Sequence, residues 1–235
     1  MTSLGDRMKA YEAPYNQKLT PRSCVIIRVD GRAFHTFTRG MKKPFDHTLM
    51  DAMVMAAVGT ARGMQGFKLG YVQSDEATFL LTDFETHDTK GWFGYELNKL
   101  VSLSASLFTG HFNMQMHYHS GLAAFDSRAF VVPREDVPNM FVWRQQDWER
   151  NSLQMLARAH FSHKECHGKN RQQLHDMLML EKGVNWADLS GQEKNGSIIL
   201  KNKTVRHDRF TYETIDRYLD AVIRDGETGV STLAG

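Results

Sequence analysis

The order of apolar and polar positions predicts alternating strands and helices in the first part of the chain. The expected elements are a strand at 23–30, a helix at 46–63, strands at 66–73 and 77–84, a helix at about 95–111 and a strand at 122–132. The first strand is a β-branched apolar run, and Asp46 is a suitable N-cap for the first helix. The short Ser-Asp-Glu turn between the middle strands indicates a hairpin.

This β-α-β-β-α-β order is typical of an α+β ferredoxin-like fold, in which an antiparallel sheet carries two helices on one face. After Pro133 the pattern becomes helical at 137–161 and 169–181, and GSIILKN predicts a late strand. We therefore expect a ferredoxin-like core at 1–133, with a helical extension and tail at 134–235 packed on the same domain.

The composition indicates an ordinary globular protein, with 41% hydrophobic and 24% charged residues. Its longest stretch without Asp, Glu, Lys or Arg, from Leu100 to Phe125, is too polar to span a membrane. The first residues lack the apolar core of a secretory signal. The two cysteines, Cys24 and Cys166, form no disulfide framework. These features predict a cytoplasmic protein without a membrane partner.

Charge is unevenly distributed although the net charge is only +2. Residues 1–43 contain nine basic and three acidic residues, whereas residues 44–100 contain four basic and eight acidic ones. From Lys194 to Arg209 there are five basic residues and one acid. Basic ends around an acidic middle fit a protein that binds a polyanion and also holds cations, although solvated faces of a soluble protein give the same pattern.

Two acidic turns are the strongest candidates for chemistry. The first strand ends in Asp30-Gly31, and the hairpin turn carries Ser74-Asp75-Glu76. Because the first and third strands are neighbours in a ferredoxin-like sheet, Asp30 and Asp75 are expected within a few ångströms of each other. Two such carboxylates are stable when protonated or bridged by cations, and paired Mg²⁺ ions with carboxylate ligands catalyse phosphoryl displacement. Each sequence alone is also typical of an ordinary turn.

The segment after Gly31 suits a phosphate ligand. Gly31 permits close approach of a phosphate and leaves its carbonyl oxygen available to a cation. The backbone amides of the following loop, Arg32-Ala33-Phe34-His35, are placed to surround a triphosphate. Lys43 precedes the helix capped by Asp46, where it is either a phosphate contact or a solvated loop residue.

Six blocks of sequence resemble one known family. VDGRAFHTFT, KKPFD, YVQSDEATF, NKLVSLSAS, FDSRAFVVP and WRQQDWERNS match, in order and spacing, the tRNA-His guanylyltransferase-like 3′-to-5′ polymerases. The resemblance covers roughly residues 8–200, and the pairing of DGRxFHxFT with QSDE is highly specific.

The resemblance implies a catalytic core similar to a polymerase palm. It also implies an Mg²⁺-dependent nucleotidyltransferase that uses two metal ions and adds nucleotides to the 5′ end of tRNA. In this family ATP activates a 5′-monophosphate, the 3′-hydroxyl of an incoming GTP or other NTP then attacks, and AMP leaves. Members usually assemble as tetramers.

The resemblance also assigns roles to individual residues. Asp30, Asp75 and Glu76 match the catalytic acids, and together with Gly31 they match the metal site. The nucleotide-binding positions implied are Gly31, Arg32, Ala33, Phe34, His35, Lys43, Asp46, Ser74 and Lys99.

Two departures from the eukaryotic pattern bear on specificity. Tyr95-Glu96 stands where the eukaryotic enzymes carry arginines, and Glu149-Arg150-Asn151-Ser152 replaces a His-Ile-Asn-Asn pattern tied to the tRNA-His anticodon. These departures resemble the bacterial and archaeal like-proteins. They predict template-dependent repair of tRNA 5′ ends, with tRNA-His-specific addition of an extra G as the alternative.

Other positions are candidates for RNA contact or for packing. We expect tRNA to contact the densest basic stretch of the chain and the segment that replaces the eukaryotic His-Ile-Asn-Asn pattern. The residues concerned are Arg150, Asn151, Lys194, Lys201, Lys203, Arg206 and Arg209. Trp143, Arg144, Gln145 and Trp148 have helical spacing suited to stacking on nucleotides, with Trp143 expected in the core. A structural zinc site is a further hypothesis for the cluster His160, His163, Cys166 and His167. If these residues lay on one helix, the three histidines would share a face, and Cys166 would supply a thiolate.

Two other classes of protein share parts of this pattern. A different two-metal palm enzyme, such as a nucleotide cyclase or a nuclease, would have the same acidic pair but need no polynucleotide 5′ end. A non-catalytic RNA-binding module would expose aromatic side chains on its central strands, and Tyr71 is the main candidate there.

Overall fold

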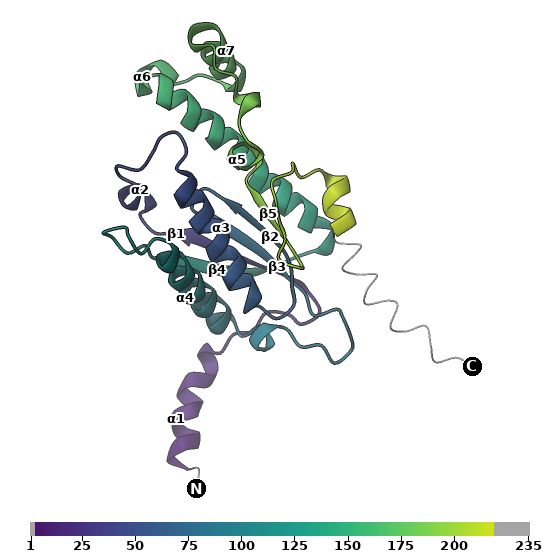
Figure 1. The fold of residues 1–235 in the computed structure, drawn as a ribbon. Coiled ribbons are helices and arrows are strands. Elements are labelled where there is room, and N and C mark those ends of the chain that lie inside the picture. The colour runs from purple at the N-terminus through teal and green to yellow at the C-terminus, as the bar shows by residue number, and fades with distance from the viewer. Residues whose placement is uncertain (1–2, 219–235) are drawn as a thin grey trace, which may run out of the picture.

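A computed structural model describes residues 3–218 of the chain. Its centre is a six-stranded sheet in the order β4-β1-β3-β2-β5-β6, in which all neighbouring strands are antiparallel (Figure 1). The strands are β1 (Cys24–Gly31), β2 (Phe67–Gln73), β3 (Glu76–Leu81), β4 (Phe125–Val132), β5 (Ser197–Leu200) and β6 (Val205–Arg206). The β4-β1-β3-β2 order confirms the predicted ferredoxin-like arrangement.

Two helices cover one face of the sheet, as the hydrophobic pattern predicts. They are α3 (His47–Arg62) and α4 (Leu97–Gln115), which pack on the side chains of Val25, Ile27 and Val29. Asp46 caps α3 by accepting a hydrogen bond from the Leu49 amide at 3.1 Å. The alternate residues of β1, Cys24 and Ile26, point to the opposite face.

A single long helix, α5 (Val137–His160), covers that opposite face. Beyond the sheet, α5 continues into a projection that we call the arm, which consists of the end of α5, α6 (His163–Cys166) and α7 (Arg171–Lys182) (Figure 1). The arm has its own small core around Leu156 and Leu178. The short α8 (Gly191–Asn195) then leads into β5, which pairs with β2.

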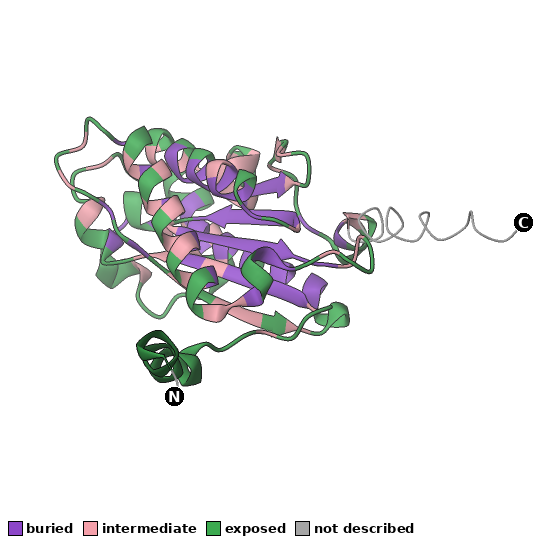
Figure 2. Ribbon diagram, turned by 90° about the horizontal axis from the view of Figure 1, so that it is seen from below, coloured by how far each residue is buried: buried purple, intermediate pink, exposed green. Residues whose placement is uncertain are grey.

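The centre of the sheet is buried, whereas the N-terminal helix is exposed. All residues of β2 and β3 are buried, whereas α1 (Leu4–Glu12) has no buried residue and stands apart from the body (Figure 2). The sequence pattern did not predict α1. No helix in the described range 3–218 is long and apolar enough to cross a membrane.

The second predicted helix differs from the sequence expectation at both ends. The second helix begins at Leu97 rather than Tyr95, because Phe93, Gly94 and Tyr95 all have positive φ angles that no helix continues. That helix also runs on to Gln115, and the Asn113 side chain donates to the carbonyl oxygen of Ala123 at 2.9 Å.

The expectation that Trp143 packs in the core is wrong. Its side chain is 51% exposed, whereas Trp148 is 2% exposed. The two positions are five residues apart on α5, which rotates them by more than 100° about the helix axis, so only one of them faces the sheet.

Candidate active site

The register of β1 and β3 brings the two predicted metal-binding carboxylates to one edge of the sheet. Asp30 lies opposite Glu76, and the Gly31 amide donates to the carbonyl oxygen of Asp75 at 3.0 Å. Ser74 has a left-handed φ of 49°, which turns the hairpin, and its hydroxyl donates to Asp75 Oδ1 at 2.9 Å. Asp30 Oδ2 lies 3.6 Å from Nη2 of Arg128 on β4.

Asp75 is held in a setting that disfavours its charge. Burial raises the pKa of Asp75 above its ordinary value, the Ser74 hydrogen bond lowers it, and the nearby charge of Asp30 raises it again. A cation between these carboxylates would stabilise both. Among the described residues no group of three or more His, Cys, Asp or Glu is placed to hold a metal. Two carboxylates and a carbonyl oxygen nevertheless suit Mg²⁺, which takes its remaining ligands from water and phosphate.

Gly31 is required by close packing at this edge. A Cβ atom there would lie 2.5 Å from Cδ2 of Phe34 and 3.1 Å from Cβ of Asp75. Phe34 opens the short helix α2 (Phe34–Phe37) and packs against Phe112 and Phe125. The missing side chain therefore lets the chain turn directly from β1 into α2 beside Asp75.

A cavity of about 310 Å³ opens next to Asp75. Of the predicted nucleotide-binding residues, those lining it are Phe34, His35, Lys43, Asp46 and Ser74. Two further lining residues come from α5: Trp148, a candidate for stacking on nucleotides, and Met155, which was not predicted as part of the site. We call this cavity the nucleotide pocket.

Asp46 and Arg32 have structural contacts that limit their predicted roles. Both oxygens of Asp46 accept backbone amides, from Leu49 and from Lys42, each at 3.1 Å. The Arg32 amide donates to the carbonyl oxygen of Ala124 at 2.8 Å, so it is not free to surround a phosphate. Within the short helix α2, the Thr36 amide donates to the carbonyl oxygen of Ala33 at 2.9 Å.

Glu76 is bound by an arginine on α5. Arg144 Nε and Nη2 donate to its two carboxylate oxygens at 2.7 and 3.0 Å, and Arg28 lies 3.8 Å from Oε2. Burial raises the pKa of Glu76, and Arg144 opposes that shift. The assignment of Glu76 to the metal site stays a prediction, and its observed partner is Arg144.

Arg28 and Arg144 belong to this cluster. Arg28 was not predicted as a site residue, and Arg144 was expected to contact nucleotides rather than to pair with Glu76. Each has a recognisable signal: Arg28 is a charge within the apolar β1 run, and Arg144 lies between Phe141 and Trp148 on the buried stripe of α5. A buried arginine needs a carboxylate partner, but the sequence does not say which one.

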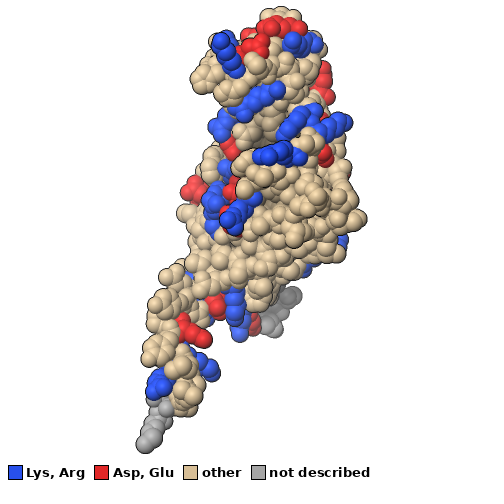
Figure 3. Space-filling model, turned by 90° about the vertical axis from the view of Figure 1, so that its left-hand side faces the viewer, with Lys and Arg blue, Asp and Glu red and all other residues tan. Residues whose placement is uncertain are grey.

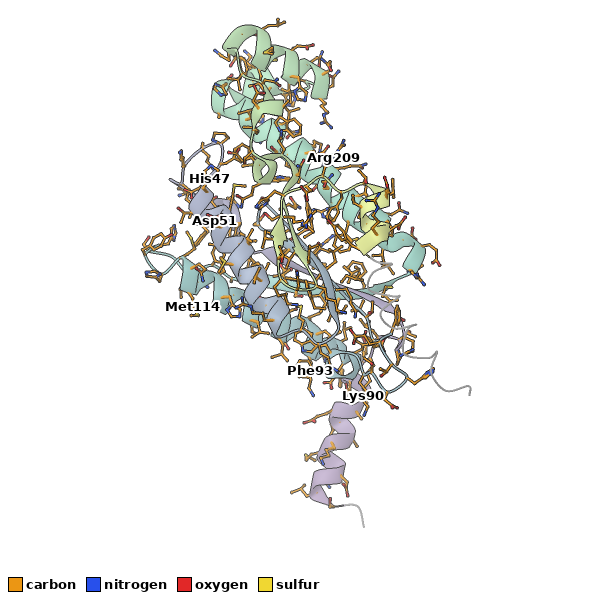
Figure 4. The ribbon with its side chains drawn as sticks, turned by 45° about the vertical axis from the view of Figure 1, so that its right-hand side comes forward. His47, Asp51, Lys90, Phe93, Met114 and Arg209 are labelled. Atoms are coloured by element: carbon orange, nitrogen blue, oxygen red, sulfur yellow. The ribbon has the colours of Figure 1, made fainter. Side chains whose placement is uncertain are left out.

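Lys99 is not brought to the pocket within one copy of the chain. It lies in the first turn of α4 and pairs with Glu96 at 3.2 Å. The site end of β1 adjoins Thr109, whose hydroxyl accepts from the Phe125 amide at 3.2 Å, and ten residues of helix separate Lys99 from it by about 15 Å. Figure 4 shows the corresponding separation of Phe93 and Met114, which flank the two ends of α4.

Several basic residues expected to bind tRNA have partners in the fold. Lys194 donates to the Ala187 carbonyl oxygen, Lys203 Nζ lies 4.1 Å from the Phe67 ring centroid, and Arg206 lies 3.8 Å from Asp208. Arg150 pairs with Asp147, and Arg209 Nε pairs with the buried Glu149 at 2.8 Å. Lys201 and Asn151 are exposed and half-buried respectively. Their contact with tRNA stays a prediction.

The histidine and cysteine cluster does not lie on one helix. The long helix ends at His160, and Ser162 caps the separate α6, so the premise that its histidines share a helical face is wrong. The rings of His163 and His167 are 5.8 Å apart.

Tyr71 is not available for base stacking. It is 1% exposed beneath α5, and its hydroxyl donates to the Asn195 carbonyl oxygen at 2.7 Å. The hypothesis of a non-catalytic RNA-binding module therefore lacks its main candidate for an exposed aromatic side chain on the central strands.

Comparisons with known proteins identify the family of the chain. The family model described as tRNAHis guanylyltransferase matches residues 5–133. The structure of a bacterial tRNA(His) guanylyltransferase-like protein in complex with ATP superposes with a TM-score of 0.87 at 42% identity, covering 95% of this chain and 99% of that one.

Two more relatives extend the comparison. A bacterial tRNA(His) guanylyltransferase-like protein in complex with GTP gives a TM-score of 0.76 at 36% identity, over 95% of this chain and 99% of that one. The tRNA(His) guanylyltransferase of Eremothecium gossypii is 27% identical, over 85% of this chain and 91% of that protein. The chain belongs to the tRNA-His guanylyltransferase family of nucleotidyltransferases, on the side of its bacterial like-proteins.

Proposed function

We propose that this chain adds nucleotides in the 3′-to-5′ direction to the 5′ end of tRNA, using ATP to activate the 5′ phosphate and two Mg²⁺ ions. Its role is template-dependent repair of incomplete 5′ ends. The observation that carries the proposal is the juxtaposition of Asp30 and Asp75 beside a nucleotide-sized pocket. The similar bacterial proteins that hold ATP and GTP support a nucleotide in that pocket.

Asp30, Asp75 and the Gly31 carbonyl oxygen would hold the metal ions. Bound Mg²⁺ supplies charge neutralisation for the phosphates and for the attacking and leaving oxygens. The hydrogen bond from the Gly31 amide to Asp75 fixes the spacing of the two acidic strand ends. The Ser74 hydroxyl orients Asp75 by donating to its Oδ1.

The walls of the nucleotide pocket would orient the substrate. Lys43 and His35 line it as groups able to contact phosphates. Phe45 packs edge-on against Trp148 at 6.3 Å, which gives the pocket an apolar wall for a base or ribose. Holding the reacting groups in line is a large part of such catalysis.

The buried position of Glu149 supports the repair role. This residue replaces the first position of the eukaryotic anticodon-linked pattern, and it is 3% exposed between Arg209 and Arg171. A carboxylate buried between two arginines offers no surface to an anticodon. Selection of the nucleotide by pairing with the opposite tRNA strand needs no such identity check.

We extend the proposal to a homo-oligomer, a tetramer as the family resemblance implies, and to a cytoplasmic site of action. The support for assembly is α1, on which Leu4, Met8 and Tyr11 are exposed by 69, 43 and 69% at helical spacing. An apolar stripe that no part of residues 3–218 covers is typical of a protein interface.

The test is incubation of the protein with intact and 5′-truncated tRNA transcripts, each NTP in turn, with product length read on a gel. We expect addition to the truncated transcripts that needs ATP for a 5′-monophosphate, and little addition to the intact ones. The Asp30→Ala variant should be inactive, with an unchanged circular dichroism spectrum. Nucleotide turnover that needs no RNA would instead indicate a cyclase-like palm enzyme.

A further inference from the structure

A second cavity lies in the arm, between the end of α5 and the segment that joins α6 to α7. Its volume is about 140 Å³, and its charged and imidazole lining comes from Arg158, His163, His167 and Lys169. No acidic residue lines it. We call it the arm cavity.

The cations of the arm cavity lack counter-charges, unlike their neighbours. Arg150 pairs with Asp147, and Arg171 lies 3.6 Å from Glu149. Within residues 3–218, Arg158 and Lys169 form no ion pair with a carboxylate. Basic side chains gather over this upper part of the molecule (Figure 3).

The acid nearest in sequence does not compensate them. Glu165 accepts hydrogen bonds from the Ser162 amide at 2.7 Å and from its hydroxyl at 2.5 Å, as part of the capping box of α6. These bonds lower the pKa of Glu165 and orient its carboxylate toward the helix start. The arm cavity therefore keeps a positive character at neutral pH.

This chemistry suits a phosphate group. Arginine and lysine donate charge-assisted hydrogen bonds to phosphate oxygens, and neutral or charged imidazoles add further donors. The volume is less than half of the 310 Å³ of the nucleotide pocket, so it suits one phosphate group better than a nucleoside triphosphate.

The position of the arm cavity indicates where that phosphate comes from. Gln154 lines the arm cavity, and the next residue of α5, Met155, lines the nucleotide pocket. Arg158 follows Met155 by three residues, or about 4.5 Å along the helix axis. A polynucleotide whose end occupies the pocket can therefore reach the arm cavity with a neighbouring part of its backbone.

We propose that the arm cavity binds a backbone phosphate of the RNA substrate and so holds the acceptor end against α5. This inference rests on the proposed function, because it assumes that the nucleotide pocket receives the 5′ end of an RNA. It assigns to Arg158 and Lys169 a role in RNA affinity and none in binding the free nucleotide.

The first experiment uses Cys166 as a reporter inside the cavity. Cys166 is half-buried in the lining and Cys24 is buried in the core, so alkylation by N-ethylmaleimide can be followed separately at each by peptide mass. We expect tRNA to slow alkylation of Cys166 roughly fivefold or more at low salt, and much less at high salt. ATP and inorganic phosphate at millimolar concentration should leave the rate unchanged. Equal protection by inorganic phosphate would mean a free-anion site and would overturn the proposal.

The second experiment measures tRNA affinity of an Arg158→Gln/Lys169→Gln variant as a function of salt. We expect the dissociation constant to rise about tenfold at physiological salt and the salt slope to fall by about one, since the contact with one phosphate is lost. The matched control is Lys90→Gln/Lys164→Gln, which removes the same charge outside the cavity, with Lys90 at the far end of the molecule (Figure 4). The control should stay within about twofold of the wild type.

ATP binding separates failure of this inference from failure of the proposed function. The double variant should bind ATP as the wild type does. If the wild type binds tRNA and the variant binds it equally well, the arm cavity is not an RNA site, while the proposed function stands. If the wild type binds ATP but no tRNA, the proposed function fails and this inference fails with it.

Discussion

At the scale of single residues, the site concentrates charges that the fold alone does not favour. Asp75 is largely buried beside Asp30, and Glu76 is buried against Arg144. Such settings occur where a protein keeps a charged group for chemistry, at the expense of stability. Stability and activity should therefore respond in opposite directions to the same substitution.

Asp75→Asn should raise the melting temperature of the metal-free protein while abolishing nucleotide addition. Because folding raises the pKa of Asp75, its ionised form destabilises the folded state at neutral pH, and asparagine removes that penalty. The gain should shrink as pH falls toward about 3, where the wild-type carboxylate is mostly protonated in both states. Thermal melts at several pH values measure it.

Mg²⁺ with ATP provides the control for that prediction. It should raise the melting temperature of the wild type and leave that of Asp75→Asn nearly unchanged. A variant that is active, or one that melts lower than the wild type at neutral pH, would contradict the assignment of Asp75.

Arg144→Met should destabilise the fold by about 3–5 kcal/mol, because it leaves Glu76 buried without its partner. Adding Glu76→Gln should recover much of the loss, since the stranded charge is then gone. Urea unfolding of the two single variants and the double variant measures the coupling between the positions. Additive losses would show that Arg144 and Glu76 do not form the pair described.

At the scale of elements, the turn from β1 into α2 is the part in which we expect substitutions to be tolerated least. Gly31→Ala places its Cβ 2.5 Å from the Phe34 ring, which must move against Phe112 and Phe125. We expect a loss of stability of about 1–3 kcal/mol together with a large loss of activity. Gly110→Ala on α4 has nothing within 4 Å of its new Cβ, and it should stabilise the helix by about 0.5–1 kcal/mol with normal activity. Equal behaviour of the two variants would contradict the close packing at Gly31.

Lys43, in the loop before α3, should matter for the triphosphate more than for the RNA. Lys43→Ala should raise the KM for NTP by roughly tenfold, as expected for the loss of a charged phosphate contact, while tRNA affinity changes little. Lost tRNA affinity at an unchanged rate with subsaturating NTP would place Lys43 on the RNA surface instead.

The sequence predicts those elements for which residue propensity, capping residues and hydrophobic pattern all indicate the same structure. The β-branched run of β1 and the Asp46 cap of α3 are strong local features, and the strand order follows from them. Contacts between distant residues are different: Arg144 and Glu76 are 68 positions apart, and only the docking of α5 on the sheet brings them together. The same docking decides that Trp148 rather than Trp143 is buried.

At the scale of the whole molecule, charge pairing decides which basic residues remain for RNA. The segment from Lys194 to Arg209 is dense in basic residues. In the fold, however, some of these residues pair with acidic side chains, as Arg206 and Arg209 do. The arm, which has no comparable excess in sequence, keeps Arg158 and Lys169 unpaired among the described residues. Net charge along the chain is thus a weaker guide to an RNA surface than pairing within the fold.

In the function proposed above, the opposite tRNA strand, rather than the protein, selects the added nucleotide. A mismatch forfeits pairing and stacking worth on the order of 1–3 kcal/mol, which supplies discrimination without a base-specific pocket. The most direct measurement uses a tRNA that lacks its first 5′ nucleotide, with the opposing base set in turn to A, C, G and U, and identifies the nucleotide added. We predict the complementary nucleotide in all four cases, on several tRNA species, with addition stopping when the acceptor stem is complete. Addition of G in all four cases, and only to tRNA-His, would contradict the account.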